Sequence, residues 1–146
     1  FGLGLKLPND KTDVTYYGYG PYESYSDKHR ASWVDRFDTT VDDMFEDYVF
    51  PQENGSHYNC QYASVGNLFA KGKKPFSFQA SRYSEKELDE KAHNFELVPS
   101  DGIYVALDYK QSGIGSNSCG PRLAEKYQIR EEKIEWEISI RFDNKN

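Results

Sequence analysis

The end of the chain carries the pattern that most restricts how it can fold. Apolar and polar side chains alternate strictly over residues 134–142, and the apolar ones are Ile134, Trp136, Ile138, Ile140 and Phe142. Side chains of a strand point to opposite faces in turn, so a period of two predicts a strand with one buried and one solvated face. This pattern favours a fold built on β-sheet.

Three further segments favour strands. Residues 14–19 are rich in tyrosine and β-branched residues, residues 76–81 alternate apolar with polar side chains, and residues 103–107 form an apolar run. Glycine, proline and small polar residues gather between these segments and predict loops there. The predicted loops are residues 18–30, 51–56, 72–75 and 108–121.

One helix is predicted to begin after Ser84. Glu87 follows Ser84 at the spacing of a capping box, and Leu88 and Ala92 fall on one helical face before Asn94. Short strands separated by turns, with a single short helix, are typical of an antiparallel β-sandwich. We therefore expect one all-β domain.

Composition limits the partners and the compartment. The 146 residues suit a single domain, and 24 acidic against 18 basic residues give a net charge of -6. That charge argues against nucleic acid as a partner. We see no signal-like or membrane-length apolar segment, so we expect no membrane partner and a cytoplasmic location. Cys60 and Cys119 could pair, and the sequence leaves both states open.

Residues 108–121 contain three glycines, three serines, an asparagine and a proline, and such loops often hold phosphates or nucleophiles. Gly115 and Gly120 match the two glycines of a phosphate-binding loop. However, Pro121 and Arg122 stand where that loop needs Lys and then Ser or Thr. Pro121 also lacks a backbone donor. The phosphate-loop hypothesis is therefore rejected.

Two other glycine-loop classes fail on spacing. A dinucleotide-binding turn needs a third glycine at the position held by Ser118. A hydrolase nucleophile elbow needs glycines two residues either side of its serine, and neither Ser116 nor Ser118 has them. The segment therefore predicts a connection between strands.

Metal and nucleophile chemistry has weak support. His57 and Cys60 have ligand-like spacing, and Cys119 or His93 could complete a zinc site, but no second close pair exists. If residues 58–62 form a strand, His57 and Cys60 point to opposite faces. We interpret them as a polar loop histidine and a buried thiol, and we predict no metal site.

Carboxylates and tyrosines are abundant, but their arrangement is not specific. A glycosidase needs two carboxyl groups facing each other across a cleft, whereas most acids here lie in polar runs that suit a solvated face. A group of tyrosines near the start could stack on sugars, although packing explains any single ring better. These tyrosines are Tyr16, Tyr17, Tyr19, Tyr22 and Tyr25.

Four blocks of the sequence resemble the C-terminal, or small-chain, domain of family 2 β-galactosidases. The first contains GPYESYSD, residues 20–27, and the others are residues 48–55, 76–84 and 108–121. The blocks follow the family order and span nearly the whole chain. On this resemblance, residues 1–146 form the later part of that C-terminal β-sandwich domain, in a supersandwich like that of galactose mutarotase.

The resemblance also implies an activity for the whole enzyme. It implies retaining hydrolysis of terminal β-D-galactosides such as lactose, by two glutamates with Mg and Na ions. Those glutamates belong to a barrel domain earlier in the family sequence, so we assign no catalytic residue, cofactor or metal to this chain. Phe1 stands without an initiating methionine, so we expect a piece of a longer protein. Its implied partner is the rest of the β-galactosidase chain or a large subunit, with substrate at the cleft edge.

In a well-known bacterial member, this domain lends a tryptophan to the sugar cleft from the interval between the second and third blocks. Here that interval, residues 56–75, contains no tryptophan. Leu68 and Phe69 are the nearest apolar candidates for substrate contact, and His57 lies near the same edge. Trp136 is instead expected in the core.

Three alternatives remain open. The tyrosines would suit a free-standing carbohydrate-binding module. An independent mutarotase-like epimerase would need a histidine facing a carboxylate, and His29, His57 and His93 carry no matching motif. A pure interaction or complementation subunit differs from the main hypothesis only in whether Leu68 and Phe69 contact substrate.

Overall fold

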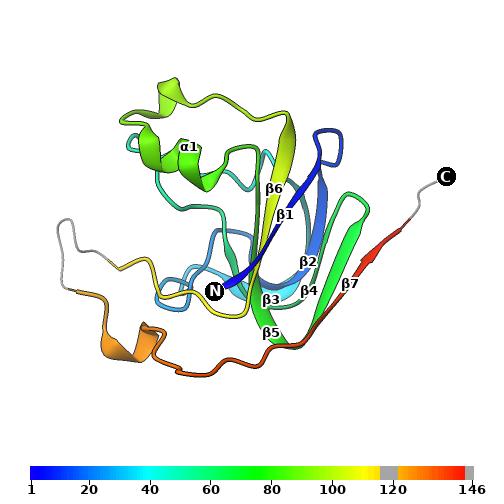
Figure 1. Ribbon diagram of the computed structural model, residues 1–146, viewed down its shortest axis with the longest axis vertical. Coiled ribbons are helices and arrows are strands. Elements are labelled where there is room, and N and C mark those ends of the chain that lie inside the picture. The colour runs from blue at the N-terminus through cyan, green and yellow to red at the C-terminus, as the bar shows by residue number, and fades with distance from the viewer. Residues whose placement is uncertain (116–121, 144–146) are drawn as a thin grey trace.

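The computed structural model describes residues 1–115 and 122–143. Within these ranges the strands form one antiparallel sheet in the order β1-β6-β5-β4-β2-β3, with β7 added beside β5 (Figure 1). The strands are β1 (Gly2–Pro8), β2 (Asp13–Gly20), β3 (Trp33–Thr40), β4 (His57–Val65), β5 (Leu68–Ser81), β6 (Gly102–Asp108) and β7 (Ile138–Phe142). The helices are α1 (Glu85–Glu90) and the 3-10 turns η1 (Asn94–Glu96) and η2 (Glu125–Tyr127). The all-β class with a short helix is confirmed, and the sheet is consistent with a sandwich.

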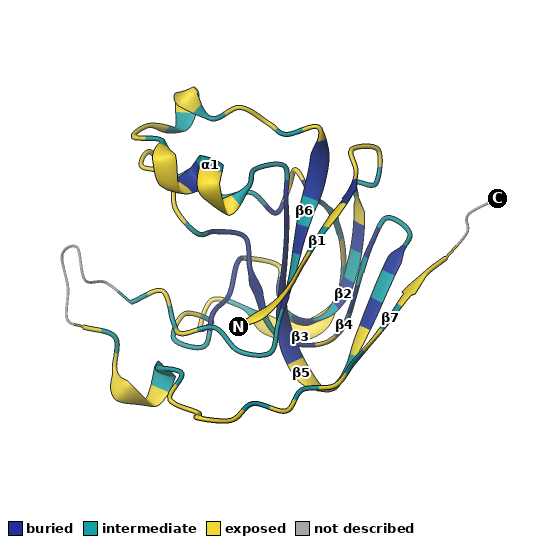
Figure 2. Cartoon of the chain, viewed as in Figure 1, coloured by how far each residue is buried: buried dark blue, intermediate teal, exposed yellow. Residues whose placement is uncertain are grey.

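One face of this sheet carries the core (Figure 2). Val14 and Tyr16 of β2 are buried, whereas Thr15 and Tyr17, which alternate with them, are partly solvated. The same alternation in β6 buries residues 103, 105 and 107. The strands predicted over residues 14–19 and 103–107 are confirmed, because a period of two places their apolar side chains on this face.

The loop predicted over residues 72–75 is wrong, because β5 continues through it. Lys71 pairs with Tyr62 of β4, and Phe76 pairs with Cys60, so the register shifts between these two points. Gly72 and Pro75 lie within that irregularity, where a residue without a side chain or without an N–H group is tolerated. Glycine and proline therefore mark a bulge here rather than a break.

The predicted final strand is only half formed. Residues 138–142 pair with Leu68–Gly72 of β5, but residues 134–137 lie outside the strand. From Ser77 onward β5 pairs with β6 instead. In the register of β7, residues 134–137 would face residues 73–76, where β5 is irregular, and what remains of the pairing is a hydrogen bond from the Lys73 N–H to the Glu137 carbonyl at 3.2 Å. Trp136 nevertheless packs against the core, as expected.

The helix start is confirmed, but the helix is shorter than predicted. The Ser84 hydroxyl accepts a hydrogen bond from the Glu87 N–H at 3.0 Å, and Leu88 is buried. The helix ends at Glu90, so Ala92 lies beyond it. The Ala92 N–H instead donates to the Glu96 carboxylate at 3.1 Å, which draws the chain into η1. No helix in residues 1–115 or 122–143 is long and apolar enough to cross a bilayer.

Candidate functional site

Glu23, in the first of the four blocks, is buried beyond the end of β2. Its carboxylate accepts the Gly55 N–H at 2.9 Å and also hydrogen bonds from the Lys28 ammonium and the Tyr48 hydroxyl. Burial by itself would raise the pKa of Glu23, but these donors outweigh it and hold the pKa below its usual range. Glu23 is therefore an ionised anchor that joins the first block to the second.

Ser24 ties the first block to the residues that directly follow the second block. Its N–H donates to the Ser56 carbonyl at 2.7 Å, and its hydroxyl accepts the Tyr58 N–H at 2.9 Å. The hydroxyl also donates to the Tyr19 carbonyl at 3.2 Å. One small buried side chain thus satisfies groups from β2 and from the start of β4.

The third block joins through Asn54. The Gln79 side-chain amide of β5 donates to the Asn54 carbonyl, and the Asn54 side chain accepts the Glu46 N–H at 3.1 Å. Gly55 follows at φ 69°, and a Cβ there would lie 2.5 Å from the Met44 carbonyl oxygen. Only glycine fits this position without strain.

The fourth block is held by Asp27. Its carboxylate accepts the N–H groups of Ile114 at 3.2 Å and Gly115 at 3.0 Å. A Cβ on Gly113 would meet Asp27 Cγ at 2.2 Å, so glycine lets the carboxylate approach the loop. The glycine-rich segment thus binds an anion after all, but the anion is a carboxylate of the same chain. Residues 116–121 of this segment lie outside the described residues.

We call this convergence the block junction, defined by Glu23, Ser24, Asp27, Asn54 and Gln79. The sequence analysis used the four blocks as family markers and missed that they meet. Asp27 and Gly115 are 88 residues apart, so no local pattern reports their contact. The carboxylate in the first block and the glycines in the fourth were the only signals available.

Glu53 borders the block junction and is a candidate site residue that the sequence analysis missed. The Tyr25 hydroxyl donates to its carboxylate at 3.4 Å. Burial, with the nearby charge of Asp108, raises the pKa of Glu53 to about 7, and burial likewise raises the pKa of Asp108. Chemically, such a carboxyl group can hold a proton near neutral pH or receive a cation.

Two of the three predicted substrate-binding residues point into the core. Leu68 is 1% exposed and pairs with Val65 next to the β4–β5 turn. His57 is also 1% exposed and lies 4.3 Å from the Tyr16 ring and 5.5 Å from the Phe78 ring. Burial lowers the pKa of His57 to about 4, so the imidazole is neutral at pH 7.

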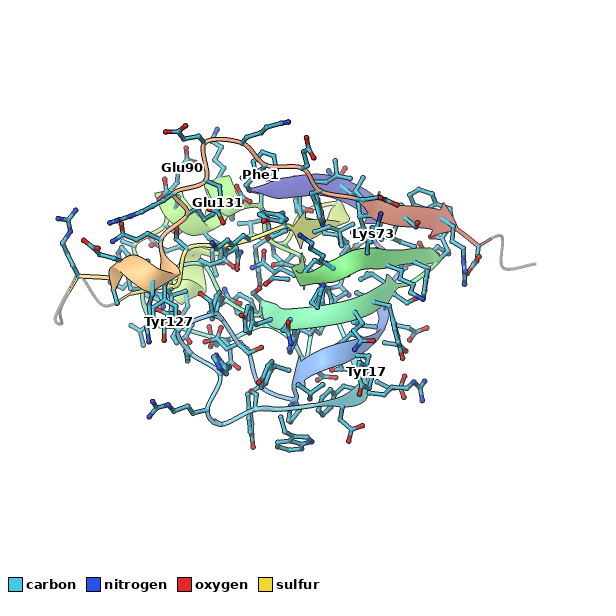
Figure 3. All side chains as sticks on the ribbon, turned by 90° about the horizontal axis from the view of Figure 1, so that it is seen from below. Phe1, Tyr17, Lys73, Glu90, Tyr127 and Glu131 are labelled. Atoms are coloured by element: carbon cyan, nitrogen blue, oxygen red, sulfur yellow. The ribbon has the colours of Figure 1, made fainter. Side chains whose placement is uncertain are left out.

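Phe69 lies on the other face of the sheet and is half-buried. It belongs to a row of aromatic rings that crosses β2, β4 and β5 and begins at Tyr17, which is labelled in Figure 3. Tyr62 stacks on Phe69 at 5.8 Å from the β4 side, and the Arg141 guanidinium of β7 lies 4.2 Å from its ring centroid. Strands on both sides of β5 therefore cover the faces of this ring. The structure does not bring Phe69 together with Leu68 and His57.

The prediction that His57 and Cys60 point to opposite faces is wrong. Asn59 between them has φ 58°, and the β4–β5 register shifts between His57 and Cys60. This irregularity breaks the alternation and leaves both side chains buried. Within the described ranges, no group of three His, Cys, Asp or Glu side chains could hold a metal ion. Cys119, and with it the possible Cys60–Cys119 pair, lies outside those ranges.

The fold and the block junction define an all-β domain whose sequence blocks are tied together by buried polar contacts. A family model described as "Beta galactosidase small chain" matches residues 1–142. The chain belongs to this β-galactosidase small-chain family.

Relatives named β-galactosidase match over nearly the full length of the chain. The protein of Actinobacillus pleuropneumoniae is 48% identical over 98% of this chain, and that of Staphylococcus xylosus is 43% identical over 97%. The protein of Photobacterium profundum is 34% identical over 95%. The chain spans only 14%, 15% and 13% of the length of these three relatives.

Proposed function

We propose that this chain is the later part of the C-terminal domain of a family 2 β-galactosidase. The whole enzyme hydrolyses terminal β-D-galactosides such as lactose with retention of configuration. One observation carries this proposal: a protein named β-galactosidase is 48% identical over 98% of the chain, yet the chain spans only 14% of it. The chain is then a non-catalytic part, and the catalytic glutamates lie elsewhere in the enzyme.

The proposed architecture follows from the same resemblance. The sheet is one layer of a supersandwich like that of galactose mutarotase, and it packs on a catalytic barrel in the rest of the chain or in a large subunit. We place the Mg and Na ions of the enzyme outside this chain and derive no step through them. The proposed compartment is the cytoplasm.

The proposed role at the substrate is to shape the edge of the sugar cleft. Of the three candidate residues, Phe69 has the accessible surface, so we assign it the contact, made by the ring edge beside Arg141. Leu68 and His57 would support the β4–β5 hairpin from the core side. A ring-edge contact is weaker than stacking on a ring face.

Steady-state kinetics of the whole enzyme on lactose test both parts of the proposal. Phe69→Ala is expected to raise KM by about two- to fivefold with little change in kcat, since it removes a contact made equally in ground and transition states. The control is Tyr17→Ala, which shortens the same aromatic row at its far end. No hydrolysis of any β-galactoside by the wild-type enzyme would overturn the proposed activity. Equal kinetics for the two variants would remove Phe69 from the cleft.

A further inference from the structure

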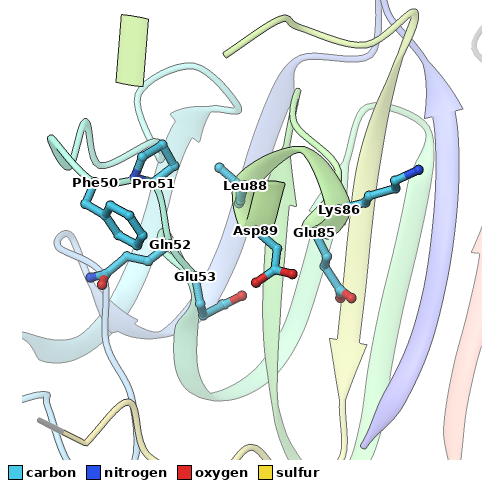
Figure 4. Close-up of a pocket in the computed structure, with 8 residues that line it drawn as sticks. All are labelled: Phe50, Pro51, Gln52, Glu53, Glu85, Lys86, Leu88 and Asp89. Atoms are coloured by element: carbon cyan, nitrogen blue, oxygen red, sulfur yellow. The ribbon is translucent and has the colours of Figure 1, made fainter. Parts of the chain in front are cut away.

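A groove lies between α1 and residues 50–53. It encloses about 660 Å³, and Phe50, Pro51 and Leu88 supply its apolar lining. Figure 4 shows residues 50–53 on one side and α1 on the other. We call this hollow the α1 groove.

The apolar surface extends beyond the groove. Val49 is 73% exposed, Phe50 66% and Phe95 81%. The Asn94 N–H donates to the Val49 carbonyl at 3.1 Å, which places Phe95 of η1 next to the residues that lead into the groove. Large apolar side chains that gather on one surface are typical of an interface.

Three of the four charged side chains that line the α1 groove are acids. Glu53 on one side and Glu85 and Asp89 on the other direct three carboxyl groups toward the same space (Figure 4). Lys86 also lines the groove, but its ammonium lies 3.7 Å from Glu90. Among residues 1–115 and 122–143, no ion pair involves any of the three acids. The raised pKa of Glu53 agrees with a carboxylate buried near Asp108 and Glu85 without a cation.

We propose that the α1 groove is the docking site for a segment of the β-galactosidase chain outside these 146 residues, which inserts an Arg or Lys beside an apolar side chain. The apolar side chain covers Phe50 and Leu88, and the cation meets Glu53, Glu85 and Asp89. A second copy of this chain fits less well, because each copy has a net charge of -6 and would bring the same acids together. This inference rests on the proposed function and names the partner surface.

Hydrogen exchange in the whole enzyme, read by mass spectrometry, tests the proposal. Asp89→Lys reverses a charge that faces the groove, and Glu90→Lys makes the same reversal one residue later on the same helix, outside the groove lining. Asp89→Lys is expected to speed exchange about tenfold in residues 49–53 and in one peptide of the enzyme beyond these 146 residues. The reason is that a lysine at position 89 repels the docked cation and so makes local opening of this contact easier. Glu90→Lys is expected to leave both peptides unchanged.

A second pair of variants tests the apolar part. Phe50→Ser is expected to deprotect the same outside peptide, whereas Phe142→Ser, at an exposed phenylalanine of β7, is expected not to. Because both residues are exposed, neither change removes a core side chain. The outside peptide would also be expected to contain the partner Arg or Lys.

Two results would overturn the inference. One is that no peptide outside the 146 residues responds to Asp89→Lys or Phe50→Ser. The other is a response only within this domain that depends on protein concentration, which would indicate a second copy as the occupant. Lactose hydrolysis by the wild-type enzyme is measured in parallel. Its absence would refute the proposed function, while the exchange result alone decides the docking surface.

Discussion

The block junction and the α1 groove both contain buried or half-buried acids, but the two regions shift the pKa of their acids in opposite directions. Glu23 in the junction has three donors from its own chain, and its pKa is held low. Glu53 in the groove has hydrogen bonds only from uncharged groups, a long one from Tyr25 and one from the Gln111 side chain, and burial raises its pKa to about 7. A satisfied carboxylate holds a fold together, whereas an unpaired one marks a place where a partner can contribute. The block junction therefore satisfies its carboxylate within the chain, whereas the α1 groove leaves carboxylates for a partner to pair.

Removing the Glu23 carboxylate from the block junction should cause the largest loss of stability. Glu23→Ala leaves the Gly55 N–H and the Tyr48 hydroxyl without their acceptor and should lower the local free energy of opening by about 3 kcal/mol. Native-state hydrogen exchange of β2 and β4 amides in the whole enzyme measures it. Glu87→Ala, at a carboxylate that instead accepts the Val98 N–H on the surface, is the control. Equal protection in both variants would contradict an anchoring role for Glu23.

Adding a side chain to the backbone of the second block should lower stability nearly as much. Gly55→Ala places a Cβ against the Met44 carbonyl at a positive φ, and we expect a cost of about 2–3 kcal/mol. Gly4→Ala is the matched control, since a Cβ on Gly4 meets nothing within 4 Å. Thermal unfolding of the two variants compares them directly. If Gly4→Ala lowered the midpoint as much as Gly55→Ala, steric strain at Gly55 would not be the cause.

Removing the contact between Asp27 and the glycine-rich loop should cause a smaller loss of stability. Asp27→Ala removes the acceptor of the Ile114 and Gly115 N–H groups, and we expect a loss of about 1–2 kcal/mol. Faster exchange should be confined to the segment after β6. Asp27→Asn, which keeps one oxygen acceptor, should recover part of the protection. Uniform loss across the sheet would show that Asp27 supports the core rather than the loop.

Local sequence patterns predicted the elements that depend only on their own residues. The strand at residues 14–19 and the cap at Ser84 needed only their own sequence. The bulge at residues 72–75 and the shortened final strand depend on how β5 pairs with its neighbouring strands, which no local pattern contains. The family blocks were visible in the sequence, but the contact of Asp27 with Gly115 requires the folded chain.

The most direct test of the comparison is the effect of Glu53→Gln on stability as a function of pH. For the 146-residue chain by itself, the pKa of Glu53 rises from 4.5 when unfolded to about 7 when folded. The folded state therefore binds the proton more tightly, and this contribution to stability is full below pH 4.5 and is lost as the pH rises through 7. Glu53→Gln removes that loss, so the variant chain should be more stable than wild type by about 1–2 kcal/mol at pH 8 and equal to it near pH 4.

In the whole enzyme the sign at pH 8 should reverse, because a docked cation stabilises the ionised Glu53. Chemical unfolding of wild type and Glu53→Gln at pH 8, in the chain and in the whole enzyme, measures both signs. A stabilising substitution in the chain and a destabilising one in the enzyme is the result we predict. A stabilising or neutral substitution in the whole enzyme would contradict the claim that the α1 groove is completed by a cationic partner.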